Sequence, residues 1–90
     1  MTERELFEKN LEISSEFSRY IVANPKVAKR IPRDAEVIFL VESDPELSRC
    51  NLKLGKKLRE GGTPVVFVKI KGVRPLEETR LIEPHLEFAA

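Results

Sequence analysis

The sequence predicts a small α/β protein organised around one strand, helix, strand unit. Residues 36–42 and 64–71 are short apolar runs rich in β-branched residues, and residues 45–60 between them repeat apolar positions at helical spacing. A crossover helix of this length joins parallel strands of one sheet with a right-handed connection. Ninety residues with 41% hydrophobic content support one modest core. We therefore expect residues 1–90 to form a single domain.

A long N-terminal helix is predicted over residues 3–23, because Thr2 and Glu5 fit a capping box. One row of apolar residues at helical spacing holds Leu6, Ile13, Phe17, Tyr20 and Ile21. A second row holds Phe7, Leu11, Ser14, Ser18 and Val22. Since the two rows are too wide for one contact, we expect one to cover the sheet and the other to meet the next helix or a second copy of the chain. A partner-binding groove is the alternative interpretation of the second row.

A short helix over residues 25–30 follows, with Asn24 before it and Pro25 at its first position. Ile31 ends this helix because a residue that precedes proline avoids the helical region. The strand at 36–42 is continuously apolar from Val37 to Val41, which is typical of a strand buried on both faces.

The helix at 45–60 begins with Asp44 as its cap and Pro45 at its first position, and it ends at Gly61-Gly62. Its predicted core side holds Leu47, Cys50, Asn51, Leu54 and Leu58. Cys50 is the only cysteine, so the chain forms no internal disulfide, and we expect an inert buried thiol. We expect Asn51 to hydrogen-bond nearby backbone.

The C-terminal residues 81–87 alternate in part, with Ile82, Leu86 and Phe88 in phase. Pro84 restricts this stretch to an edge strand or an extended tail, because proline has no N–H for an inner ladder. Of the two, we expect a third, edge strand.

Composition limits the classes of function. A net charge of +1 argues against a dedicated nucleic-acid binder. No apolar run is long enough for a membrane span, and residues 1–20 alternate charges where a signal peptide would be apolar, so we expect a cytoplasmic protein. Charged residues make up 34% of the chain and glutamine is absent, which resembles thermophile composition.

A ligand site is the first functional candidate, at Ser43, Asp44, Lys71 and Arg74. These residues follow the two predicted strands, where open parallel sheets present ligands. The loop at 42–46 lacks the glycines that wrap a phosphate, and its acids suit a helix cap better than a Mg²⁺ site. A small polar ligand is one interpretation, and the favoured one is an ordinary surface ion pair.

Catalysis and structural metal binding are not expected. His85 is the only histidine and has no Ser or Cys nucleophile near it in sequence, and one His with one Cys cannot build a structural zinc site. We therefore predict no enzyme activity, no catalytic residue, no cofactor and no metal.

A basic helix face is the second functional candidate. Residues 45–60 carry five bases against two acids, a net charge of +3. Arg49, Lys53, Lys56 and Lys57 would contact nucleic acid, but no aromatic residue lies among them for base stacking. A solvated face is the favoured interpretation, and nucleic acid is a disfavoured partner.

Several stretches resemble a family of short archaeal and bacterial proteins known only as a domain of unknown function. The resemblance covers about residues 7–86 and is carried by Ile31-Pro32, Ala35 to Leu40, Asp44 to Leu47, Asn51-Leu52, Lys56 to Gly61 and Pro64 to Val68. It implies a compact α/β fold and a thermophilic prokaryotic origin. Because the matching positions are caps, turns and core residues, it implies no activity and no site residue.

The leading functional hypothesis is protein–protein interaction, above all self-association into a dimer. It rests on the surplus apolar surface of the first helix and on the charge contrast between residues 3–20, five Glu against three bases, and residues 45–60. The candidate interface residues are Phe7, Leu11, Ser14, Ser18, Leu52, Ile82 and Leu86. The alternatives are nucleic-acid association through the basic helix and an enzyme or ligand binder at the strand ends, with the ligand unknown.

Overall fold

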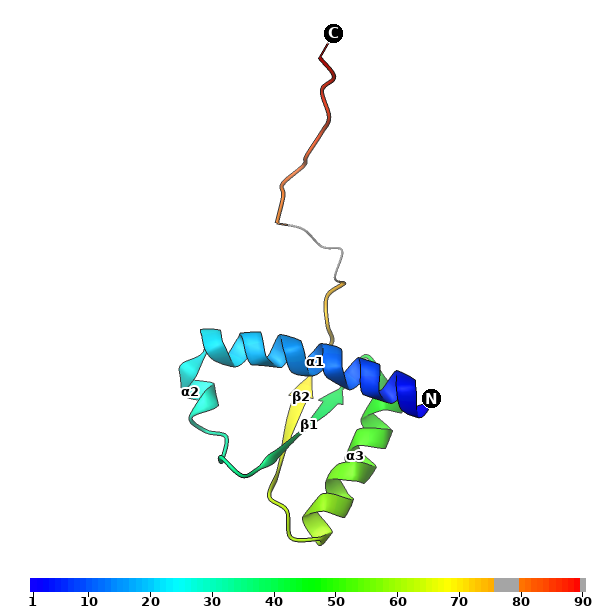
Figure 1. Cartoon of the computed structure of the whole chain (residues 1–90), viewed down its shortest axis with the longest axis vertical. Helices are drawn as coiled ribbons and strands as arrows, with labels where there is room; N and C mark the ends of the chain where they lie inside the picture. Colours follow the sequence, from blue (N-terminus) through cyan, green and yellow to red (C-terminus); the bar gives the residue numbers. More distant parts are fainter. Residues whose placement is uncertain (76–79, 90) are drawn as a thin grey trace.

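The computed structural model describes residues 1–75 and 80–89. Its elements are α1 (Glu3–Ala23), α2 (Pro25–Ala28), β1 (Glu36–Val41), α3 (Pro45–Glu60) and β2 (Val65–Ile70). This order and the parallel pairing of β1 with β2 confirm the predicted α/β fold. Figure 1 shows α1 lying across the two strands near their carboxyl ends, α3 beside them, and the C-terminal residues extending away from the body.

The helix ends form where the capping residues predict them. The Thr2 hydroxyl accepts the Glu5 N–H at 3.1 Å, and the Asp44 carboxylate accepts the Leu47 N–H at 3.2 Å. Each bond satisfies an amide that has no partner inside its own helix. Hydrogen bonds within three residues of each cap therefore determine where α1 and α3 begin.

The sheet register decides which residues meet each helix. Glu36 is paired with Val65 and Val41 with Ile70, so alternate residues of the two strands share a face. The α1 face carries Phe39 and Val41 with Val68 and Ile70, which pack with Ile13 of α1 and Leu47. The α3 face carries Ile38 and Phe67 next to Gly55. As predicted, β1 is covered on both faces, whereas β2 is only half-buried.

One predicted core position of α3 is wrong. Leu47, Asn51 and Gly55 are buried, but Leu54 is 48% exposed. A Cβ on Gly55 would lie 2.6 Å from the Phe67 ring, so α3 approaches the sheet along the line of residues 47, 51 and 55. Leu54 lies to the side of that line because the described sheet has only two strands to cover. Cys50, expected to be buried, is half-buried.

The expected third strand is also wrong. Within the described part of the C-terminal stretch, residues 80–89, no residue belongs to a strand, and the backbone is an exposed extended tail. The other predicted form, a tail over 81–87, is therefore the observed one. We name residues 80–89 the C-terminal segment.

Candidate functional site

The four predicted ligand residues at the strand ends lie in three different environments. Ser43 donates its backbone N–H to the Lys71 carbonyl at 3.1 Å, which continues the strand pairing by one step. Asp44 turns away from them, toward α1 and the start of α3. Lys71 is exposed, and Arg74 borders a hollow that neither Ser43 nor Asp44 reaches. The fold therefore does not gather these four side chains into one cleft, and their ligand role stays a prediction.

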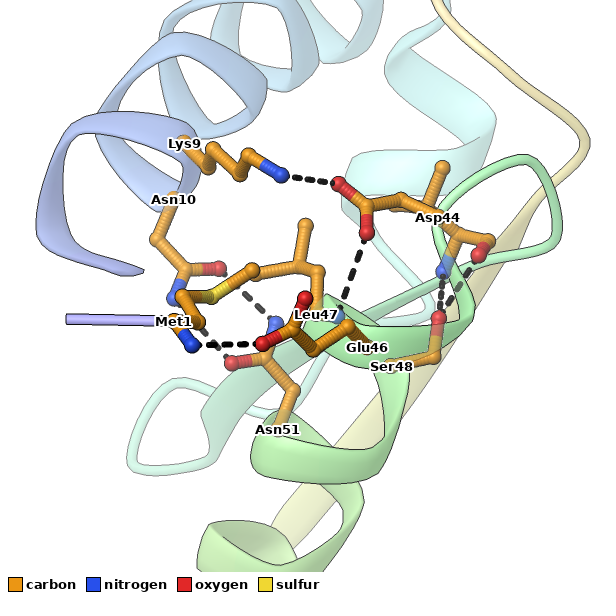
Figure 2. A network of polar contacts seen from close by, with 9 residues as sticks. Met1, Lys9, Asn10, Asp44, Glu46, Leu47, Ser48 and Asn51 are labelled. Carbon is orange, nitrogen blue, oxygen red and sulfur yellow. Dashed lines mark hydrogen bonds and ion pairs between the residues drawn. The ribbon is translucent and has the colours of Figure 1, made fainter. Parts of the chain in front are cut away.

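Asp44 is already engaged by two partners. Its Oδ2 accepts the Lys9 ammonium at 2.7 Å, and its Oδ1 accepts the Leu47 N–H (Figure 2). The hydrogen bond from Lys9, aided by the Leu47 amide, lowers the pKa of Asp44 below its ordinary value, and the same pair raises the pKa of Lys9. Both groups are therefore charged across the neutral range, and this carboxylate serves as cap and ion-pair partner.

Beside Asp44, the Met1 ammonium forms an ion pair with Glu46. This contact raises the pKa of the amino group and lowers the pKa of the Glu46 carboxyl. Negative charge at Glu46 also lies in the first turn of α3, where the helix dipole favours it.

Side chains of α3 take the place of a neighbouring strand along the outer edge of β1. The Ser48 hydroxyl accepts the Val41 N–H at 2.8 Å and donates to the Val41 carbonyl at 2.6 Å. One step along, Asn51 Nδ2 donates to the Phe39 carbonyl at 2.9 Å. These bonds satisfy the backbone groups that β1 directs away from β2. The expected hydrogen bond from Asn51 to backbone is thereby confirmed.

Asn10 and Asn51 also exchange a reciprocal pair of hydrogen bonds. Asn10 Nδ2 donates to Asn51 Oδ1 at 3.0 Å, and Asn51 Nδ2 donates to Asn10 Oδ1 at 2.8 Å (Figure 2). Asn51 is only 3% exposed, and both N–H groups and the oxygen of its amide take part in hydrogen bonds that join α1, β1 and α3. Sequence reasoning missed this partnership, because the two residues lie 41 positions apart. Among the described residues no buried side-chain N or O atom lacks a partner, so this cluster presents no open group to a ligand.

A second feature is a hollow of about 910 Å³ beneath α1 and α2, over β2. We name it the β2 hollow. Its apolar lining includes Phe17, Tyr20, Val27, Ile31, Val66, Val68 and Ile70. Four bases and one acid also border it: Arg19, Arg30, Lys69, Arg74 and Glu16. Sequence reasoning missed it because three elements build it jointly, although Phe17 and Tyr20 belonged to the predicted apolar row.

The predicted interface residues of α1 lie at its surface. Phe7 is 66% exposed and Leu11 is 55% exposed, with exposed Ser14 and Ser18 beyond them. The Ser18 hydroxyl donates to the Ser14 carbonyl at 3.0 Å, so these serines leave a low, locally satisfied surface. On α3, Leu52 is half-buried.

The basic residues of α3 are exposed. Arg49, Lys53, Lys56 and Lys57 take part in no ion pair within the part of the chain that the structure describes. His85 is exposed as well and lies 3.4 Å from a carboxylate oxygen of Glu87. In residues 1–75 and 80–89 no three His, Cys, Asp or Glu side chains gather in a way that would hold a metal ion.

These features define a small single-domain α/β protein with a parallel βαβ unit, a helix packed on one face and an open apolar hollow over its second strand. The chain belongs to the family of unknown function DUF5647, whose model matches residues 5–84. This match confirms the resemblance to a domain of unknown function. Searches of curated proteins and of solved structures gave no match. Among the described residues, no helix has the length and apolar character needed to cross a membrane.

Proposed function

We propose that this protein is an interaction module that associates with a second copy of itself. The observation that carries the proposal is the β2 hollow, where apolar residues of one sheet face lie beneath an open space. Val66, Val68 and Ile70 are only half-buried, whereas Phe39 and Val41 on the same face of β1 are buried. A second protein surface would remove this apolar area from water, which is the main favourable term in protein association.

The exposed row of α1 supports the same proposal. Phe7 and Leu11 present apolar side chains beside two serines, whose small size permits another backbone to approach. A twofold dimer brings the same patch of both copies together, so one apolar row would cover its own counterpart. Residues 3–20 carry a net charge of −2, so two α1 rows that face each other gain no electrostatic attraction, and the apolar contact supplies the free energy of association.

The oligomeric state tests the proposal. We expect light scattering coupled to size exclusion to give the mass of a dimer for the wild-type chain. A stable dimer of this kind should bury more than about 1,000 Å². Leu11→Glu should shift this mass toward the monomer, because a buried carboxylate without a partner opposes association. Leu54→Glu on α3 is the matched control, since Leu54 is similarly exposed and lies off the proposed row. A wild-type chain that remains monomeric at high concentration contradicts the proposal.

Nucleic-acid association is the second candidate, favoured by the exposed basic face of α3, whose four bases form no ion pair in residues 1–75 and 80–89. If Arg49, Lys53, Lys56 and Lys57 contact phosphates, fluorescence polarisation with labelled RNA or DNA should show binding that weakens as salt rises. Replacing Lys53 and Lys56 with Gln should weaken binding and reduce the salt slope. Binding that ignores both changes, or no binding at low salt, contradicts this candidate.

The setting of the module belongs to the same proposal. We infer a cytoplasmic protein of a thermophilic prokaryote; the charged fraction of 34% and the absence of glutamine support the thermophilic origin. Highly charged surfaces of this kind are compatible with any function, so the charged fraction bears on origin alone.

A further inference from the structure

The two edges of the sheet differ in how their backbone groups are satisfied. Ser48 and Asn51 cover the outer edge of β1 with three hydrogen bonds. The Glu36 N–H bonds to the Pro64 carbonyl and the Glu42 N–H to the Ile70 carbonyl, so even-numbered residues of β2 pair with β1. The backbone groups of Val65, Phe67 and Lys69 therefore point to the other side of β2. Within the described residues the sheet ends there, which leaves an open edge beside the β2 hollow.

The C-terminal segment carries apolar side chains in the spacing of a strand. Ile82, Leu86 and Phe88 are 90%, 82% and 87% exposed, and alternate positions place them on one side of an extended chain. These three side chains leave a large apolar area in contact with water, which a partner surface could bury.

We propose that the C-terminal segment of a second copy adds to the open edge of β2 as a third strand and covers the β2 hollow with Ile82, Leu86 and Phe88. The inference rests on the proposed self-association and names the segment that performs it. Strand addition supplies main-chain hydrogen bonds for affinity and alternate side chains for specificity. Residues 82–88 span about 23 Å when extended, which suffices for a strand of six residues.

Pro84 determines the direction of the added strand. In an antiparallel pair, the residues that bond to Val65, Phe67 and Lys69 lie on the same face of the sheet as those residues, which is the α3 face. The residues between them lie on the face of the hollow, and their N–H groups point away from β2. Ile82, Pro84, Leu86 and Phe88 would occupy those turned-away positions, where a missing N–H costs nothing. In a parallel pair, residues on the hollow face would have to donate to β2, and Pro84 has no N–H to donate. The geometry is therefore compatible with antiparallel addition only.

Opposite charges near β2 and on the C-terminal segment favour that segment as the partner that covers the β2 hollow. The charged lining of the β2 hollow has a net charge of +3, from four bases against one acid. Residues 82–88, which would form the added strand, hold two Glu and no Lys or Arg, a net charge of −2. In antiparallel order Glu83 is placed opposite Lys69 and Glu87 opposite Val65, so one acid of the segment meets the exposed base of β2. The apolar face of the segment thus meets the apolar hollow, while its acids lie on the opposite face of the sheet, where Glu83 meets Lys69.

The backbone of the segment is consistent with docking. Glu83 has a φ of 42° and directly precedes Pro84, although a residue before proline prefers the extended region. Docking as a strand moves Glu83 into that preferred region. Because Figure 1 shows the segment running away from its own body, exchange between two copies fills both hollows and closes the assembly with twofold symmetry.

Cysteine cross-linking in full-length chains tests the inference. In a Cys50→Ser background, one chain carries Lys69→Cys and the other Glu83→Cys. Mild oxidation of the mixture should give a disulfide-linked heterodimer, because the pair lies within the Cα separation that a disulfide spans. The matched mixture of Lys69→Cys with Glu87→Cys should link far less, since Glu87 lies four residues along the partner strand. Stronger cross-linking of Lys69→Cys with Glu87→Cys than with Glu83→Cys overturns the antiparallel arrangement. A third chain carries both Lys69→Cys and Glu83→Cys. If a disulfide forms only inside this chain and never between two chains, the exchange between copies is overturned.

A second measurement separates this inference from the proposed function. Leu86→Glu should raise the dimer dissociation constant at least about tenfold, whereas His85→Glu, which adds the same charge on the opposite face of the segment, should change it less than about threefold. A wild-type dimer that tolerates Leu86→Glu and gives no cross-link overturns the role of the segment and leaves self-association intact. A monomeric wild-type chain overturns both.

Discussion

Replacing Asn51 with alanine should test how much of the stability depends on the polar contact between α1, β1 and α3. The change removes the hydrogen bond to the buried Phe39 carbonyl and both bonds to Asn10. A buried carbonyl left without a donor costs about 1–3 kcal/mol, and each hydrogen bond in the partly exposed pair contributes about 0.5–1.5 kcal/mol. We therefore expect Asn51→Ala to lower the free energy of unfolding by about 2–6 kcal/mol.

Asn10→Ala should cost less, about 1–3 kcal/mol, because it removes the two reciprocal bonds but leaves the bond from Asn51 to Phe39 in place. Urea unfolding followed by circular dichroism measures both values, provided that the slope with denaturant does not change. The double variant should cost less than the sum of the single variants, since the two residues share their reciprocal bonds.

Asn24→Ala is the control, because Asn24 is also half-buried and its side chain donates only to the Tyr20 carbonyl at the end of α1. A loss below about 1 kcal/mol for Asn51→Ala would refute the reasoning. Equal losses for Asn10→Ala and Asn51→Ala would also refute it, because the Phe39 carbonyl would then contribute nothing.

Two further predictions concern single positions on α3 and at its cap. Gly55→Ala gains about 1 kcal/mol of helix propensity, but its Cβ would lie 2.6 Å from the Phe67 ring, where overpacking costs about 1–3 kcal/mol. We expect a net loss of up to about 2 kcal/mol in urea unfolding, which Phe67→Leu should reduce, and a stabilised Gly55→Ala would contradict the close approach. The fold lowers the pKa of Asp44, so the charged carboxylate stabilises the folded state. The wild-type chain should therefore be more stable than Asp44→Asn above the ordinary pKa of 3.8, and this difference should disappear as the pH falls further. Thermal unfolding of both chains across pH 2–6 measures the difference. A difference that stays constant down to pH 2 would contradict this role.

Local chemistry in the sequence determined most of the fold. The Asp44-Pro45 cap, the Gly61-Gly62 stop and the apolar runs on either side act within a few residues, so they predict the βαβ unit and its parallel pairing, as observed. The predictions of a buried Leu54 and of a third strand were wrong, because burial depends on how many strands the sheet contains, and helical spacing does not reveal that number.

The candidate sites depended on tertiary structure. Asn10 meets Asn51 across 41 residues, and the β2 hollow draws its lining from α1, α2 and β2. Such contacts arise only when whole elements pack, because no short stretch of sequence encodes the angle at which α1 crosses the strands. The sequence by itself identified Ile82 and Leu86 as interface candidates, whereas the structure alone placed an open strand edge and a hollow of opposite charge where such a segment fits.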